Sequence, residues 1–142
     1  MDYDEDKIRV AKQTATEMPR VRFELQNLLE WEYPTCDAVL LLDVLHYWVP
    51  EKQQLILNKA RKALRPGGRI ILREAARAES SDHQHVDLWE RIATRLGHNQ
   101  TTEGLHFRTL EQLTDSLKQA GFNQWEVKRE GGKHSNVMLI AW

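Results

Sequence analysis

Two residues whose side chains are suited to acid–base chemistry, Asp43 and His46, follow the apolar run CDAVLLL at residues 36–42. An apolar run without alternation is typical of a parallel strand that is covered on both faces. Open α/β sheets bind their ligands beyond the carboxyl ends of such strands. The pattern therefore predicts a ligand site here. The alternative is that His46 only covers the end of the strand.

A second acidic residue, Glu74, ends the next apolar run, RIILREA at residues 69–75. We expect it either to orient a substrate or to lie in solvent. His83 and His85 invite a metal-binding interpretation, but apolar spacing predicts a helix over residues 80–97. Residues two apart on a helix point away from each other and chelate poorly, so the sequence predicts no metal site.

The elements that position these residues alternate between helical and strand patterns. Amphipathic spacing predicts helices over residues 4–17, 50–64, 80–97 and 109–120, the last beginning with a capping box at Thr109 and Gln112. Strands are predicted over residues 21–25, 36–42, 69–75, 124–129 and 136–142. This order predicts one α/β domain over residues 1–142, with a doubly wound, Rossmann-like sheet that ends in an antiparallel hairpin.

Charge and hydropathy exclude several classes of partner. The formal net charge is -1, and no cluster of basic and aromatic residues stands out, so we expect no nucleic-acid partner. No apolar run approaches the ~20 residues that cross a bilayer. The acidic N-terminus also lacks the pattern of a signal peptide, so we expect no membrane partner and a cytoplasmic location. The single Cys36 excludes an internal disulfide.

The stretch DAVLLLDVLHYW, followed by LNKARKALRPGGRIILRE, resembles the second half of class I S-adenosylmethionine-dependent methyltransferases. In that family, a buried strand ends in a short loop with a histidine, a helix follows, and an L-x-P-G-G turn starts the next strand. VRFELQNLLEW and FRTLEQLTDSLKQAGF resemble further parts of the same domain, so the resemblance covers nearly the whole chain. It implies an enzyme that transfers a methyl group from S-adenosylmethionine to a small molecule.

The resemblance also implies a general base. LHYW is similar to the LHDW-type stretch of small-molecule O-methyltransferases, whose histidine corresponds to His46. A neutral imidazole there would remove a hydroxyl proton while the oxygen attacks the methyl group. The sequence departs from that stretch at Tyr47, which stands where the family commonly has an acid.

Cofactor-binding residues are implied in the same way. Asp2 corresponds to the family acid that binds the ribose hydroxyls. Asn27 corresponds to the family residue that contacts the adenine edge, together with the backbone of Leu28. We also expect Asp43 to bind the cofactor, because it lies in the loop after the strand at residues 36–42, where open α/β sheets place their ligands. The alternatives are a solvated terminal acid at Asp2 and an ordinary turn residue at Asn27.

One part of the family pattern is absent from the sequence, because no GxGxG loop occurs anywhere in it. By the resemblance, the chain begins within the second strand of the family and is N-terminally truncated. We therefore expect weak cofactor binding by this chain, and a homodimer that pairs the exposed edge of the strand at residues 36–42. The missing loop also favours an alternative function, a non-catalytic methyltransferase-like module for binding or assembly.

Overall fold

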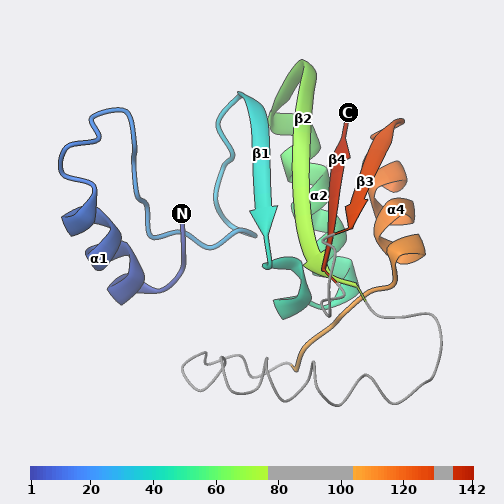
Figure 1. Cartoon of the computed structure of the whole chain (residues 1–142), viewed down its shortest axis with the longest axis horizontal. Helices are drawn as coiled ribbons and strands as arrows, with labels where there is room; N and C mark the ends of the chain where they lie inside the picture. The colour runs from blue at the N-terminus through green and yellow to red at the C-terminus, as the bar shows by residue number, and fades with distance from the viewer. Residues whose placement is uncertain (77–103, 130–135) are drawn as a thin grey trace. The chain divides into compact units, whose positions relative to one another are not determined.

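The computed structural model describes residues 1–76, 104–129 and 136–142 (Figure 1). It divides into two compact units, Met1–Pro34 and Thr35–Trp142. The helix predicted over residues 80–97, with His83 and His85, lies outside the described residues. The single domain expected over residues 1–142 stays a prediction.

The first unit contains the helix α1 (Glu5–Thr14). Asp4 caps it by accepting a hydrogen bond from the Lys7 backbone N–H, and this bond lowers the pKa of the Asp4 carboxyl. The helix ends earlier than predicted because Ala15 leaves helical geometry. The strand predicted over residues 21–25 is wrong. Only one parallel bridge forms, between Asp2 and Leu25, since the partner segment turns into α1 at once.

The second unit contains a four-stranded sheet in the order β1-β2-β4-β3. β1 and β2 are parallel, whereas β4 is antiparallel to both β2 and β3, so the predicted antiparallel end of the sheet is confirmed. The turn between β3 and β4 lies outside the described residues. The strands are β1 (Cys36–Leu42), β2 (Leu64–Ala75), β3 (Trp125–Arg129) and β4 (Asn136–Ala141).

The start of β2 includes the RPGG segment that was predicted to be a turn before the strand. The pairing of β1 with β2 is irregular there, between Cys36 and Ala38. Gly67 has a positive φ of 79°. A Cβ atom at Gly68 would lie 2.9 Å from Arg65 O and 3.0 Å from Asp37 O, so no other residue fits without a backbone shift.

Two helices, α2 (Pro50–Ala63) and α4 (Leu110–Gln119), cover one face of this sheet (Figure 1). Pro50 starts α2, and the predicted capping box of Thr109 and Gln112 starts α4. Between the helices and the sheet lies a core of fully buried apolar side chains. Its members include Ile56, Leu57, Ile70, Leu72, Leu117, Phe122 and Leu139.

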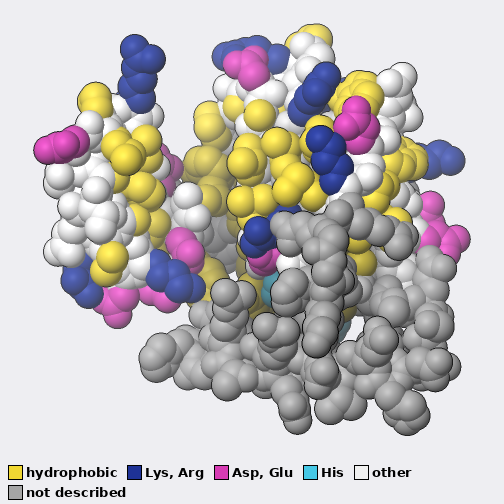
Figure 2. Space-filling model, viewed as in Figure 1, with side chains coloured by type: hydrophobic (Ala, Val, Ile, Leu, Met, Phe, Trp, Pro, Cys, Tyr) yellow, Lys and Arg dark blue, Asp and Glu magenta, His cyan; other side chains and the backbone are white. Residues whose placement is uncertain are grey.

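The other face of β1 is exposed, although the sequence predicted cover on both faces. The exposed fractions are 57% for Leu40 and 47% for Leu42, whereas Leu41 between them is buried. Figure 2 shows hydrophobic side chains gathered over this side of the sheet. Among the described strands, β1 is an edge strand with β2 as its one neighbour, which confirms the expected exposed edge.

Candidate active site

The centre of the site is a contact between His46 and Glu74. His46 lies in the short 3₁₀ helix η1 (Leu45–Tyr47) directly after β1, and Glu74 lies near the end of β2. His46 Nδ1 is 2.7 Å from Glu74 Oε2, and the exposed fractions of the two side chains are only 8% and 4%. The parallel strands bring these residues together because their carboxyl ends meet at one edge of the sheet.

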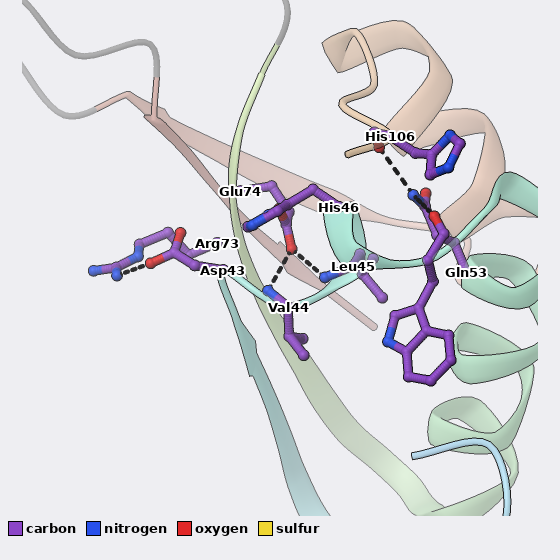
Figure 3. Close-up of polar contacts among 9 residues, drawn as sticks. Asp43, Val44, Leu45, His46, Gln53, Arg73, Glu74 and His106 are labelled. Atoms are coloured by element: carbon purple, nitrogen blue, oxygen red, sulfur yellow. Dashed lines mark hydrogen bonds and ion pairs between the residues drawn. The ribbon is translucent and has the colours of Figure 1, made fainter. Parts of the chain in front are cut away.

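The other oxygen of Glu74 holds the backbone of the turn. Oε1 accepts hydrogen bonds from Val44 N at 2.9 Å and from Leu45 N at 2.6 Å (Figure 3). A carboxylate with these contacts acts as an acceptor, so His46 Nδ1 carries the proton of the neutral ring. The lone pair of the imidazole then lies on Nε2, which is the atom able to take up a further proton.

A segment before α4 covers His46. His106 N donates to His46 O at 2.8 Å. The ring of Phe107 is stacked on the imidazole, with ring centroids 4.9 Å apart and an interplanar angle of 18°. The Tyr47 ring, at 4.3 Å, is tilted by 43°. The imidazole is therefore held by a carboxylate at its edge and by aromatic rings at its sides.

A small pocket adjoins this pair. Burial lowers the pKa of the Arg108 guanidinium in its wall, so a partly desolvated positive charge lies beside the pocket. Gln53, on α2, is almost completely buried, with an exposed fraction of 1%. The lining residues are Leu45, His46, Gln53, Glu74, Ala75, His106, Arg108 and Leu113.

The predicted cofactor residue Asp43 forms an ion pair with Arg73 of β2 (Figure 3). Its own backbone N–H donates to Arg73 O at 2.8 Å, and its φ of 55° is left-handed. Asp residues tolerate that conformation better than most side chains do. The carboxylate of Asp43 thus has a partner within the sheet, and its role toward a cofactor stays a prediction.

The other predicted cofactor residues lie in the first unit. Asp2 N donates to Glu24 O at 3.2 Å, and Gln26 N donates to Asp2 O at 2.9 Å. Asn27, which follows this bridge, accepts a hydrogen bond from Leu29 N through Oδ1 at 3.0 Å. Asp2 likewise accepts from Asp4 N at 3.0 Å. Both side chains thus stabilise local turns. Their assembly into one site with His46 stays a prediction.

In the part of the chain that the structure describes, no three His, Cys, Asp or Glu side chains gather as they would around a metal ion. None of the described helices combines the length and the apolar character needed to span a bilayer.

Comparison with known proteins decides the family. The family model described as an O-methyltransferase domain matches residues 3–123. The chain belongs to this O-methyltransferase domain family. The acetylserotonin O-methyltransferase of Gallus gallus is 30% identical over 140 residues, which cover 96% of this chain and 39% of that protein. The predicted methyltransferase resemblance is thus confirmed.

Solved structures show the same fold for this O-methyltransferase domain. Human N-acetylserotonin methyltransferase, solved with SAM, has a TM-score of 0.74 at 23% identity, covering 99% of this chain and 38% of that one. The S-adenosylmethionine-dependent methyltransferase SibL, in its apo form, has a TM-score of 0.77 at 22% identity, covering 99% and 41%. The chain therefore spans about two fifths of the length of these relatives.

The sequence pointed to His46 but not to its contacts. The sequence offered two alternatives for Glu74, which would either orient a substrate or lie in solvent. The structure instead places its carboxylate against His46. Gln53 and Arg73 were not singled out at all. One signal was available for Glu74, because it ends a strand that was expected to lie beside the strand before His46.

Proposed function

We propose that this O-methyltransferase domain takes part in methyl transfer from S-adenosylmethionine to a hydroxyl group of a small molecule, with His46 as the general base. The contact of His46 Nδ1 with the buried Glu74 carboxylate carries the proposal. It leaves Nε2 as the basic nitrogen. When bound, S-adenosylmethionine supplies an electrophilic methyl group on a sulfonium leaving group.

The roles of the two side chains follow from their geometry. His46 Nε2 takes the proton of the acceptor hydroxyl, which makes the oxygen more nucleophilic toward the methyl carbon. The ring then becomes a cation, and the carboxylate of Glu74 at 2.7 Å stabilises that charge. Glu74 also fixes the orientation of the ring through its hydrogen bonds to the backbone of Val44 and Leu45.

The residues present fit the nucleoside end of the cofactor by type. Asp2 would accept hydrogen bonds from the ribose hydroxyls, and Asn27 with the backbone of Leu28 would contact the adenine edge. A carboxylate or amide oxygen has two lone pairs, so the local bonds to Asp4 N and Leu29 N leave acceptor capacity on both side chains. Asp43 would contribute through its place after β1. The absent GxGxG loop leaves the methionine end without an evident partner in this chain.

The second candidate function is a non-catalytic methyltransferase-like module for binding or assembly. The exposed apolar side chains of β1, Leu40 at 57% and Leu42 at 47%, would offer such a module a binding surface. We propose in addition a homodimer through the edge of β1, supported by its exposed apolar side chains, and a cytoplasmic location. These proposals do not depend on His46.

The two candidate functions are tested by comparing His46→Ala with the unchanged protein that carries this chain. The measured quantities are the turnover of the methyl acceptor and the affinity for the cofactor. We expect turnover of the methyl acceptor to fall roughly 10²- to 10⁴-fold, the usual contribution of a general base, while cofactor affinity measured by calorimetry stays the same. Unchanged turnover would contradict the role of His46. Absence of any methyl transfer by the unchanged protein, across a panel of small hydroxyl compounds, would favour the module.

A further inference from the structure

Gln53 is a buried amide whose hydrogen bonds leave its own helix. Its Nε2 donates to Trp48 O at 2.7 Å. It also donates to His106 O at 3.0 Å (Figure 3). A reversed amide would place its oxygen against the same two carbonyl oxygens, so these contacts fix the orientation of the side chain.

The two carbonyl groups belong to segments that hold His46 from different directions. Trp48 ends the turn that carries His46, since its N–H donates to Leu45 O at 2.9 Å. His106 belongs to the covering segment and donates its N–H to His46 O. The next residue, Phe107, stacks on the imidazole. Gln53 therefore links the turn that carries His46 to the segment of His106 and Phe107 that covers it.

The two polar atoms of the Gln53 side chain differ in their partners. Nε2 makes both hydrogen bonds, whereas no donor among the described residues reaches Oε1, although the side chain is buried. A buried acceptor without a partner destabilises the folded state relative to an apolar side chain of the same shape. The contribution of the amide is thus its two directed bonds to backbone carbonyl groups.

We propose that Gln53 is a positioning residue for His46, which keeps the imidazole aligned by holding Trp48 and His106 together. This inference rests on the proposed function of His46 as a base. A catalytic group has to stay within about 0.5 Å of its productive place, so loosening the segment should lower kcat more than it changes substrate binding.

The test compares Gln53→Met with a matched control, Gln54→Met. Both substitutions keep the length of the side chain and remove an amide from α2. Gln54 donates instead to Asn58 Oδ1 and to Ser116 O, both at 3.1 Å, so its loss leaves the His46 region intact. The readouts are hydrogen exchange at His106 N–H by NMR, and kcat and KM of the protein that carries this chain.

For Gln53→Met we expect exchange at His106 N–H to be ~10-fold faster and kcat to be ~10-fold lower, with KM unchanged. Gln54→Met should change neither. Gln53→Asn, whose shorter amide does not span both carbonyl groups, provides the same test should the methionine variant not fold. Unchanged exchange at His106 would overturn the inference.

The result for His46→Ala separates this inference from the proposed function. If that variant loses turnover while Gln53→Met keeps it, the positioning role of Gln53 is overturned and the general base stands. If His46→Ala keeps full turnover, the proposed function falls, together with the catalytic part of the inference. Faster exchange at His106 would then show a purely structural link.

Discussion

Asp43 and Arg73 join the ends of β1 and β2 twice, through an ion pair of their side chains and through the bond from Asp43 N to Arg73 O at 2.8 Å. The left-handed φ of Asp43 turns the chain out of the strand at this point. The next two residues, Val44 and Leu45, lead to His46. The direction in which His46 leaves the sheet thus depends on Asp43.

Two substitutions at Asp43 separate the ion pair from the backbone conformation. Asn tolerates the left-handed conformation, so Asp43→Asn should lower the free energy of unfolding by less than ~1 kcal/mol, as expected for an ion pair that is over a third exposed. Asp43→Ala should cost about 1 kcal/mol more, because Ala disfavours positive φ. Urea unfolding of both variants measures the difference, and equal stabilities would contradict it.

Glu74→Gln should disturb the tautomer of His46. The amide oxygen is still able to accept from the backbone of Val44 and Leu45, but the amide nitrogen then faces His46 Nδ1 as a donor. The proton of the neutral ring should move to Nε2, which removes the proposed base. We expect ¹⁵N NMR to report this exchange of tautomers, and turnover to fall.

The matched control for this change is Glu126→Gln, at an exposed position on β3. It should leave the ring nitrogen signals of His46 as they are. The buried change should also lower the free energy of unfolding by roughly 1–2 kcal/mol, because hydrogen bonds to a charged carboxylate become weaker bonds to a neutral amide. An Nδ1-protonated ring in Glu74→Gln would contradict the assignment.

Burial raises the pKa of Tyr33 to about 12 from its ordinary value near 10. The folded state therefore binds a proton more tightly than the unfolded chain does, and its stability falls as pH rises from about 10 to about 12. In a pH titration followed by phenolate absorbance, one fraction of the tyrosine should ionise only near pH 12. Tyr33→Phe should remove this fraction, and its persistence in that variant would assign it to another tyrosine.

The edge of β1 should mediate self-association. Among the described strands, β1 is an edge strand, and its outer backbone groups beside the exposed Leu40 and Leu42 offer a template for another strand. We expect light scattering to give a mass that rises with concentration, and Leu40→Lys to abolish the rise. Val127→Lys, on the other described edge strand β3, is the control because Val127 is also exposed, at 41%. A strict monomer with rapid hydrogen exchange along β1 would contradict the prediction.

Local patterns predicted most elements of the second unit. The apolar run at Cys36 gave β1 its bounds, Pro50 gave α2 its start, and the capping box at Thr109 gave α4 its start. These features depend on neighbouring residues only. The strand predicted over residues 21–25 failed because a strand also needs a partner of matching length, which its own pattern does not contain.

The sequence placed His46 and Glu74 after or at the ends of two successive strands, but it did not predict the contact between them. His46 and Glu74 are 28 residues apart, and their contact depends on the pairing of β1 with β2. Gln53 donates a hydrogen bond to His106, which lies 53 residues further along the chain. The residue pattern of α2 does not predict that bond. Such contacts arise from tertiary structure, so no local spacing predicts them.

Gly68 lies directly before the regular pairing of the two parallel strands, which runs from Ala38 and Arg69 onward. A Cβ atom at Gly68 would lie 3.0 Å from Asp37 O, so a side chain there would force the two strands to shift. A slip by one residue would turn every following side chain of β2 to the opposite face and carry the Glu74 carboxylate away from His46. The absence of a side chain at Gly68, about 20 Å along β2 from Glu74, therefore preserves the strand pairing that brings this carboxylate to His46.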